Sequence, residues 1–434
     1  MFVSTRRRLR ASTVLVAAMT IAASPGARTA QNAGDWPQWR GPNRDGVSAE
    51  TGLLTSWPDG GPPRVWTATG LGQGLSSVSV SGGRVFTMGD RRDGQYVIAL
   101  DEATGRERWA TRVGGRHDDE YGGPRSTPTV DGELLYVVDT DGDLVCLESA
   151  TGRERWRTDM PRQFGGRMMS QWRFAESPLV DGDRVVVTPG GPTAGMVAME
   201  KTTGREIWRA TIPTFGRGGR DGAGYSSIVI SNGGGVKQYI QFVGRGVVSI
   251  RASDGWFMWG YDGVANSTAN ITTPVVIGDL VFASSAYGAG SAMLQISPAP
   301  DGRTQVSERY VVPANTLQNH HGGVVALDGY LYAGHGSSNG FPVCLDLDDG
   351  RMMWDRVRGA GSGSAAVTAA DGHLYFRYQN GVVALLEANP QRYVLKSTFE
   401  IPNVRNPSWP HPVIAGGRLY LREQDALHVY DVKR

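Results

Sequence analysis

Chemically versatile side chains recur at one kind of position in this sequence. Each stands at the end of a polar loop, just before a short aliphatic segment. They comprise a guanidinium, a carboxylate, a phenol, amides, imidazoles and an indole, which can hold charge, exchange hydrogen bonds and stack on a flat ligand. The positions are Gln73, Arg125, Glu176, Tyr225, Asn270, His320 with His321, Ser362, and Trp409 with His411. Solvated loop positions would more often be Ser, Asn, Asp or Lys, so the mixture favours one convergent ligand site.

Within this set the ligand or cofactor contacts are predicted at Arg125, Glu176, Tyr225, Asn270, His320, Ser362, Trp409 and His411. Glu176 and Asn270 carry the oxygen atoms that a hard cation such as calcium prefers. They precede segments that are two repeat units apart. The sequence therefore makes Glu176 and Asn270 the candidate metal ligands.

The adjacent pair His320 and His321 offers imidazoles for general-base chemistry or for hydrogen bonding. Neighbouring side chains on an extended strand point to opposite faces, so we expect only one ring to face a ligand. We choose His321 as the catalytic candidate. The alternative is a buried histidine that bonds backbone where the chain turns at Gly322 and Gly323.

Other patterns with chemical meaning do not hold up. The stretch DTDGDL, residues 139–144, resembles the start of a calcium loop but has no glutamate at the twelfth position. GRGGR, residues 216–220, has no strand-to-helix setting for a phosphate, and no GxSxG, HExxH or CxxC motif occurs. These segments are read as turns and loops.

The elements that must position the candidate residues repeat along the chain. Short hairpins recur as SGGRVF, DGELLY, DGDRVV, NGGGVKQYI, IGDLVF, DGYLY, DGHLY and AGGRLY. Their glycines are Gly82, Gly132, Gly182, Gly233, Gly278, Gly329, Gly372 and Gly416, at intervals of 43 to 51 residues. A glycine turn beside an alternating aliphatic and aromatic segment is typical of a β-hairpin.

A second hairpin follows in most units, as in LDEATGRERW and LESATGRERW, where a Thr-Gly or Asp-Gly turn precedes a tryptophan. The tryptophans are Trp109, Trp156, Trp208, Trp259 and Trp354, which lie 24 to 27 residues after the glycine of their unit. Each unit thus predicts four antiparallel strands. Eight such sheets cover one another only when they stack radially, so the expected fold is an all-β, eight-bladed β-propeller.

The last unit is one strand short, because only 18 residues follow Gly416. The segment PPRVWTA places Trp66 just before the first unit. We therefore expect this N-terminal strand to complete the last blade and to close the ring, which leaves no exposed sheet edge at the junction. Residues 36–434 are then a single propeller domain.

The first 30 residues have the basic, apolar and small-residue order of an export signal, with cleavage expected between residues 24 and 33. They hold five arginines and no acid, so 39 of the 44 basic residues face all 42 acidic residues beyond them. This balance argues against nucleic-acid and membrane-surface binding. No cysteine lies near the cleavage zone, so we expect no lipid anchor in the membrane. We expect the mature protein to be a monomer in the periplasm or outside the cell.

The copies of LDEATGRERW resemble the PQQ-like, or quinoprotein-like, repeat over roughly residues 36–434, and WPQWRGPNRDG, NHHGG and WPHPVIAGGRLYLR look like a secreted bacterial branch of it. Among its relatives, quinoprotein alcohol dehydrogenases imply pyrroloquinoline quinone and calcium at the axis, beneath a vicinal disulfide. Cys146 and Cys344 occupy equivalent strands in units two and six, on opposite sides of the ring, so no disulfide joins them.

Two functions follow from this reading. One is an extracytoplasmic propeller that binds a small ligand or cofactor in its axial funnel, as in a quinoprotein-type oxidoreductase of alcohols or sugars. The other is a non-catalytic scaffold for extracytoplasmic proteins, which the resemblance to the outer-membrane assembly propeller implies. In the second case rim loops such as Arg116 to Tyr121 and Arg162 to Arg173 would hold the partner.

Overall fold

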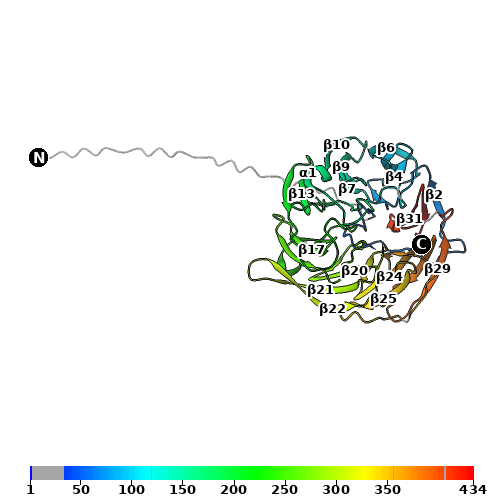
Figure 1. The fold of residues 1–434 in the computed structure, drawn as a ribbon. Coiled ribbons are helices and arrows are strands. Elements are labelled where there is room, and N and C mark those ends of the chain that lie inside the picture. The colour runs from blue at the N-terminus through cyan, green and yellow to red at the C-terminus, as the bar shows by residue number, and fades with distance from the viewer. Residues whose placement is uncertain (2–33, 119, 355, 405–406) are drawn as a thin grey trace. The chain divides into compact units, whose positions relative to one another are not determined.

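The repeated hairpins fold into eight small sheets arranged around an axis, the predicted β-propeller (Figure 1). The computed structural model describes residue 1 and residues 34–118, 120–354, 356–404 and 407–434. The expected export signal therefore lies outside the described residues, apart from Met1. Helix is limited in the described ranges to α1 (Met160–Phe164) and a single 3₁₀ turn at Gly233–Gly235. Within the described part, no helix has the length and apolar character needed to cross a bilayer.

Blades 1 to 4 each contain four consecutive antiparallel strands. Blade 1 comprises β3 (Ser79–Ser81), β4 (Arg84–Arg91), β5 (Gly94–Asp101) and β6 (Glu107–Gly114); blade 2 comprises β7 (Thr129–Asp131), β8 (Leu134–Val138), β9 (Asp143–Glu148) and β10 (Glu154–Asp159); blade 3 comprises β11 (Leu179–Asp181), β12 (Arg184–Val187), β13 (Met196–Glu200) and β14 (Glu206–Ala210); blade 4 comprises β15 (Val229–Ser231), β16 (Gln238–Val243), β17 (Gly246–Arg251) and β18 (Phe257–Tyr261).

Blades 5 to 8 continue the pattern with variations at their edges. Blade 5 comprises β19 (Val275–Ile277), β20 (Leu280–Ser285), β21 (Gly290–Pro298) and β22 (Thr304–Val312); blade 6 comprises β23 (Val324–Leu327), β24 (Tyr330–His335) and β25 (Phe341–Asp346); blade 7 comprises β26 (Ala365–Ala370), β27 (His373–Tyr378), β28 (Val382–Glu387) and β29 (Leu395–Glu400), with β1 (Val47–Ser48) added; blade 8 comprises β30 (Val413–Ala415), β31 (Arg418–Glu423), β32 (Ala426–Asp431) and β2 (Arg64–Ala68). In blade 6 the fourth strand is reduced, among described residues, to a bridge between Leu345 and Met352.

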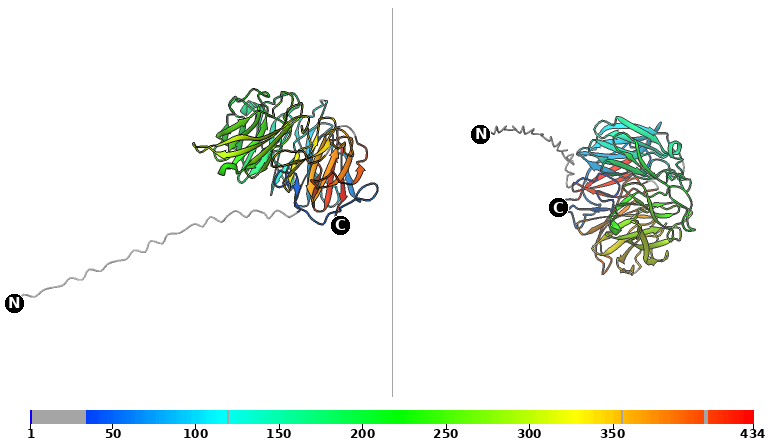
Figure 2. Two further views of the ribbon diagram at one scale, coloured as in Figure 1. Left: turned by 90° about the horizontal axis from the view of Figure 1, so that it is seen from below. Right: turned by 90° about the vertical axis from the view of Figure 1, so that its left-hand side faces the viewer.

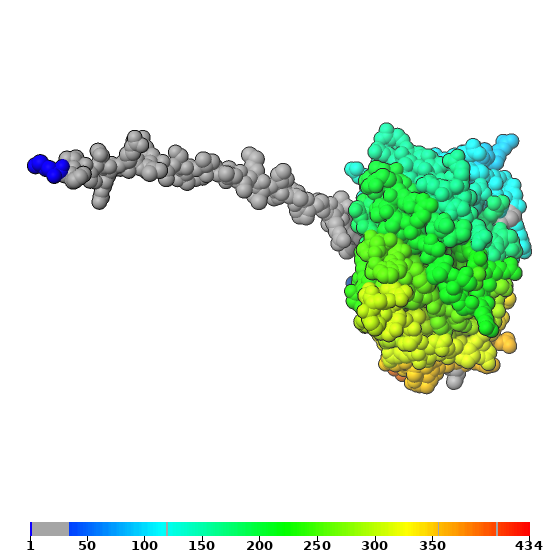
Figure 3. Space-filling view, turned by 60° about the vertical axis from the view of Figure 1, so that its left-hand side comes forward, coloured from blue at the N-terminus to red at the C-terminus, as the bar shows by residue number. Residues whose placement is uncertain are grey.

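The first and last parts of the described chain meet in blade 8. β2 pairs with β32 in antiparallel register, with Trp66 opposite Val429 and Ala68 opposite Leu427. Blue N-terminal strands accordingly lie beside red C-terminal strands in both views of Figure 2. The outer surface in Figure 3 passes from cyan through green to yellow without a break, as blades in chain order require.

The hydrophobic core is divided among the interfaces between blades. The described residues form eight clusters of buried apolar side chains, each shared by two neighbouring blades. One cluster joins Val85 of blade 1 to Val413 and Leu427 of blade 8, so the ring has no open interface. Each sheet thus buries both faces against its neighbours, which is why a single blade would not be stable alone.

The tryptophan of each repeat serves this blade-to-blade packing. The indole of Trp156 in blade 2 lies over Gly204 in blade 3, where a Cβ atom would come within 2.7 Å of the ring. Its Nε1 donates to the carbonyl oxygen of Lys201 at 3.0 Å. Equivalent bonds run from Trp66 to Glu102, Trp109 to Ser149, Trp208 to Ala252, Tyr310 to Leu347 and Trp354 to Asn389. The Thr-Gly or Asp-Gly turn therefore provides a flat docking place for the preceding blade.

A segment before the blades, residues 36–50, crosses the axis; we call it the strap. Trp36 exchanges backbone hydrogen bonds with Val80 of blade 1, and the carbonyl of Pro37 accepts from Val130 of blade 2. Further along, β1 pairs in parallel with β26 of blade 7, with Val47 opposite Ala369. The strap thus connects inner strands from distant parts of the ring.

Candidate functional site

The axis of the propeller holds a cavity of about 210 Å³ that the strap closes at one end. Its aromatic and basic lining residues are Trp39, Tyr121, Trp172, Tyr225, Tyr287 and Trp409, together with Arg40, Arg125, His320, His321 and His411. The rest of the lining is small or aliphatic, and none of the described lining side chains is a carboxylate. The site is therefore flat-walled, largely apolar and basic.

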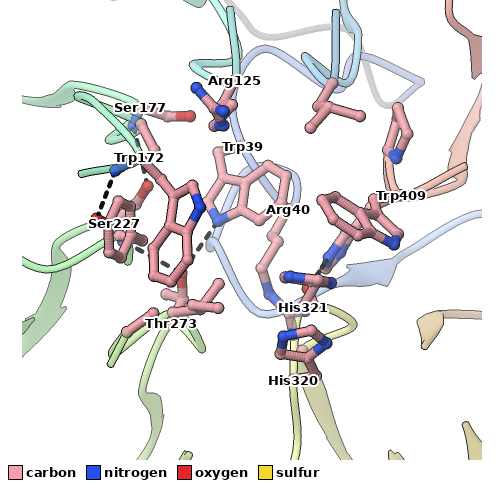
Figure 4. A pocket seen from close by; sticks show the side chains of 18 of the residues that line it. Trp39, Arg40, Arg125, Trp172, Ser177, Ser227, Thr273, His320, His321 and Trp409 are labelled. Atoms are coloured by element: carbon pink, nitrogen blue, oxygen red, sulfur yellow. Dashed lines mark hydrogen bonds between the residues drawn. The ribbon is translucent and has the colours of Figure 1, made fainter. Parts of the chain in front are cut away.

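The strap supplies the floor of this cavity. Trp39 Nε1 donates to Thr273 Oγ1 of blade 5 at 3.1 Å, and its ring lies 4.5 Å from that of His411. Arg44 donates to the carbonyl oxygens of Ser177 and Pro178 in blade 3. Ser177 and Pro178 come directly before β11, and Thr273 lies two residues before β19. The strap therefore bonds to the ends of these loops next to the inner strands, at the deep end of the cavity. Figure 4 shows Trp39 and Arg40 on the strap in the middle of the site.

Arg40 has an unusual environment for a guanidinium, since only 3% of the residue is exposed. Nη2 donates to the carbonyl oxygens of Asp45 at 2.7 Å and of Val324 at 2.5 Å. Nε and Nη1 are buried without a hydrogen-bond partner among the described residues. Burial lowers the pKa of Arg40 to about 10, which the charge of Asp45 counteracts in part, so the group stays charged at neutral pH.

Six of the predicted positions line the cavity: Arg125, Tyr225, His320, His321, Trp409 and His411. The rule that selected them, the loop end just before an inner strand, thus brings together residues from blades 2, 4, 6 and 8. Their rings contact others at the mouth. Tyr121 lies 5.1 Å from Trp409, and Trp172 lies 6.0 Å from Tyr225, measured between ring centroids.

The structure does not bring Gln73, Glu176, Asn270 or Ser362 into the cavity lining. Glu176 is 4% exposed and its carboxylate accepts from Thr188 N, Thr188 Oγ1 and Gln241 Nε2. Burial raises its pKa to about 7, against the opposing effect of those bonds. The carboxylate bonds to Thr188, just after β12, and to the buried side-chain amide of Gln241 in blade 4, which needs an acceptor.

Asn270 is likewise engaged within its own surroundings. Its Oδ1 accepts from the backbone and side-chain nitrogens of Asn266, and its Nδ2 donates to the carbonyls of Val243 and Gly244. Gln73 and Ser362 lie outside the cavity. Among the described residues, no group of three or more His, Cys, Asp or Glu side chains is placed to hold a metal ion. Cys146 and Cys344 are both buried and free, as expected.

The expectation that only one ring of the pair His320 and His321 faces the site is wrong. Both line the cavity, with ring centroids 3.5 Å apart, and His321 lies 4.0 Å from Trp409. The reason is that β23 begins only at Val324, so the alternation of a strand does not apply. Gly323, with φ of +70°, turns the backbone between the pair and the strand.

The hydrogen bonds of His320 fix its role. The Ser364 hydroxyl donates to the carbonyl of Ser337, so it accepts from His320 Nδ1 at 2.7 Å. Nε2 then accepts from the Tyr287 hydroxyl at 2.9 Å. Burial lowers the pKa of His320 to about 4, so the ring is neutral at pH 7. With both nitrogens engaged, His320 is a positioning residue.

His321 and His411 have more freedom at their nitrogens. His411 Nε2 donates to the carbonyl of His321 at 2.8 Å, while Nδ1 of each ring is buried without a partner among the described residues. Burial lowers the pKa of His411 to about 3 and that of His321 well below its ordinary value. Both rings are therefore neutral at pH 7, and Arg40 and Arg125 provide the positive charge of the lining.

The strap and the loop residues Tyr121, Trp172 and Tyr287 were not among the predicted site residues. The signal available for the strap is the run WPQWRGPNRDG, which is rich in aromatic and basic residues and lies outside every repeat. Tyr121 and Trp172 lie within the two rim loops that the sequence assigned to partner binding instead. The repeat pattern identifies residues at equivalent positions in the blades. It cannot identify the strap, which has no equivalent in any blade.

Comparisons with known proteins agree with this architecture. A family model described as outer membrane protein assembly factor BamB matches residues 58–138 and 93–356. A search of the curated proteins found no match. The structure of BamB from Moraxella catarrhalis superposes with a TM-score of 0.54 at 16% identity, covering 86% of this chain and 98% of that one.

Quinohemoprotein alcohol dehydrogenases are also similar in fold. The enzyme ADHIIG from Pseudomonas putida has a TM-score of 0.62 at 14% identity, covering 92% of this chain and 80% of its own. The enzyme from Comamonas testosteroni has a TM-score of 0.62 at 12% identity, covering 93% and 80%. At such identities the likeness concerns the fold alone.

Proposed function

The chain belongs to the family described as outer membrane protein assembly factor BamB, and we propose that within this family it is an extracytoplasmic protein that binds a small planar molecule in its axial cavity. The placement outside the cytoplasm rests on the signal-like residues 1–30. The binding role rests on the cavity. Its occupant stacks on indole and phenol rings and exchanges hydrogen bonds with the basic residues around them.

The observation that carries this proposal is the construction of the cavity from unrelated parts of the chain. Loops of several blades and the strap place six aromatic side chains around one closed-ended space. In the view of Figure 4, Trp172 lies on one side, Trp409 with His321 on the other, and Trp39 near the middle. Concave, mostly apolar sites with a few convergent polar groups are the usual form of small-molecule sites.

A quinoprotein-type oxidoreductase of alcohols or sugars remains the specific version of this proposal that the sequence suggested. The residues present do not fit its calcium, because the described lining has no carboxylate and both Glu176 and Asn270 spend their polar atoms elsewhere. Cys146 and Cys344 are free and buried, so they form no disulfide over the site. The function supported by these residues is therefore ligand binding, without an oxidation step.

His321 is the lining residue best suited to exchange hydrogen bonds with a bound molecule. Its ring is neutral at pH 7 and lies between the rings of His320 and Trp409, tilted by 35° and 39° from them. His320 and His411 each use a ring nitrogen in a bond to protein. Because burial disfavours its charged form, His321 is a weak base and exchanges hydrogen bonds with a bound molecule as a neutral ring.

The test is ligand binding by the purified secreted protein. A library of small aromatic molecules, with pyrroloquinoline quinone with and without calcium as separate samples, is screened by thermal shift and confirmed by calorimetry. Trp409→Leu is expected to weaken confirmed ligands about 10-fold through lost stacking. Trp256→Leu is the control, because Trp256 is 48% exposed and outside the cavity. Ligands that bind both variants like the wild type would place binding elsewhere and contradict the proposal.

A second function, a non-catalytic protein scaffold, is favoured by the family match and by the 98% coverage of the BamB structure. The rim loop from Arg162 to Arg173 offers exposed charge for it, since the Arg162 side chain is 86% exposed. Cross-linking in cells that make the protein would test it. Under this function, Arg162→Glu removes a cross-linked partner that Trp409→Leu retains, and the reverse result would refute the scaffold role.

A further inference from the structure

The floor of the axial cavity contains a buried positive charge that the residues of the cavity do not neutralise. Arg40 gives its bonds to two carbonyl oxygens and leaves Nε and Nη1 without a partner in the described chain. Asp45, whose charge acts on it, lies on the strap and outside the lining. A guanidinium so placed is costly to bury unless an anion compensates it.

The position of Arg40 is built by the surrounding backbone. A Cβ atom on Gly323 would lie 1.9 Å from Arg40 Nη1, and one on Gly46 would lie 2.8 Å from Nη2. Both glycines have positive φ, at +70° and +79°. The guanidinium therefore occupies a cradle that requires glycine on two sides, at a point where it also borders the cavity (Figure 4).

The other polar groups of the lining agree with an anion. Arg125 is a second guanidinium on the wall, and its Nη2 donates to the carbonyl of Tyr121. The three histidines are neutral donors or acceptors at pH 7, and the described lining contains no acid that would repel a negative charge. At the deep end, where Arg40 is buried, its charge acts more strongly than it would at the surface.

The walls restrict the shape of the occupant. Trp39, Trp172 and Trp409 present indole rings to a closed-ended cavity of about 210 Å³. Flat apolar walls of this kind favour a planar ring over a bulky saturated one, because stacking adds to burial. The volume suits one or two fused rings with a small substituent.

From these observations we infer that the ligand is a small aromatic carboxylate, with one or two fused rings, whose ring stacks on the indoles and whose carboxylate lies in the field of Arg40 and Arg125. This inference rests on the proposed binding function and makes its ligand class specific. It requires no metal ion, in agreement with the absence of a carboxylate from the described lining.

The experiment compares matched ligands on the wild-type protein by calorimetry. The probes are 2-naphthoate, the neutral 2-naphthamide, and the saturated decahydro-2-naphthoate. We expect 2-naphthoate to bind at least about 10-fold more tightly than the amide, since the neutral amide loses the attraction of Arg40 and Arg125 for a charged group. We expect a similar preference over the saturated acid.

The outcomes separate the two levels of the proposal. Equal affinity for the acid and the amide would overturn the aromatic-anion inference while leaving the binding function in place. A preference for the saturated acid would overturn the requirement for a planar ring. If no probe and no library member bound in the cavity, both the inference and the proposed function would fail.

Variants locate the charge preference. Arg40→Gln and Arg125→Gln are each expected to reduce the ratio of acid to amide affinity about 10-fold, with a smaller effect on the amide itself. Arg108→Gln is the control, because its side chain is 60% exposed and pairs with Asp101 on the surface. If Arg40→Gln does not fold, the ligand comparison on the wild type and Arg125→Gln still decides the matter. An unchanged ratio in the folded variants would contradict the assignment.

Discussion

The guanidinium of Arg40 packs against the backbone of Gly323, although the two residues lie far apart in the sequence. Nη2 of Arg40 donates to the carbonyl of the next residue, Val324, at 2.5 Å. This contact fastens the strap to blade 6 and sets the height of the cavity floor. It makes the glycine a requirement of the site, because any side chain there would displace the charge.

Gly323→Ala is therefore expected to lower the free energy of unfolding by at least about 3 kcal/mol. The new Cβ would lie 1.9 Å from Arg40 Nη1, and the residue has φ of +70°, which disfavours alanine by itself. Chemical denaturation measures the change.

Gly372→Ala is a matched control, since Gly372 has φ of +69° and no atom lies within 4 Å of the place that its Cβ would take. It should cost only the backbone strain of about 1 to 2 kcal/mol. Equal losses in the two variants would mean that the cradle around Arg40 relaxes freely.

Trp208→Phe and Trp259→Phe measure the hydrogen bond that docks one blade on the next. The two tryptophans are similarly buried, at 8% and 6% exposure, but only Trp208 donates to a carbonyl, that of Ala252. Trp259 Nε1 is buried without a partner in the described chain. Loss of the same indole volume should cost about 1 kcal/mol more at Trp208. Thermal and chemical unfolding of both variants give the difference, and a larger loss at Trp259 would contradict this role.

The spacing of the glycines predicted the eight blades because each blade must solve the same packing problem. Gly82 and Gly416 both form the turn between the first two strands of a blade. The turns at Gly152 and Gly204 pack against the tryptophan ring of the preceding blade. The same turn and the same docking contact in each blade select the same residue types at regular spacing. This is why the fold class was accessible from one sequence.

The candidate site could be predicted only in part from the sequence, because its residues do not share one structural role that repeats along the chain. The rule for loop ends found Arg125 and His321 but also selected Glu176 and Asn270, whose polar atoms bond to buried backbone and side-chain groups nearby. Which way a loop side chain turns depends on unpaired neighbours that become close only in the folded ring. Arg40 was missed because the strap has no counterpart in the blades.

The ion pair between Arg377 and Glu423 positions the loop that carries Trp409 and His411. Their side chains are 0% and 2% exposed and 2.7 Å apart, and Arg377 also donates to Ser408 Oγ and to the carbonyl of Pro410. Arg377→Met should cost about 3 to 5 kcal/mol, because it removes one member of a buried ion pair together with its bonds to Ser408 and Pro410. Denaturation of the variant measures this loss.

The double variant Arg377→Met with Glu423→Leu should be more stable than Arg377→Met alone, since it removes the second buried charge of the pair as well. Strictly additive losses would show that the two groups act independently. Ligand affinity gives a second readout, because a displaced loop would move Trp409 even where the fold survives.

His411 gives the protein a defined response to acid. Burial, with a smaller effect from the charge of Arg40, lowers its pKa from 6.5 to about 3 in the folded protein. A base with a lowered pKa contributes stability that is present above its unfolded value and is lost as the pH falls through the window from 6.5 to about 3. His411→Gln removes this titration, while the amide can still donate to the carbonyl of His321. The stability of the wild type relative to this variant should therefore fall by about 1.4 kcal/mol for each pH unit below 6.5.

Denaturation of the wild type and of His411→Gln, at neutral pH and at two acidic pH values within that window, provides the comparison. The neutral sample is the reference, because the ring is uncharged there in both the folded and the unfolded chain. Parallel stability curves would show that the ring is already hydrated or compensated. In that case the deep end of the cavity would not be the water-poor environment inferred from its burial, and the field of Arg40 on a bound anion would be correspondingly weaker.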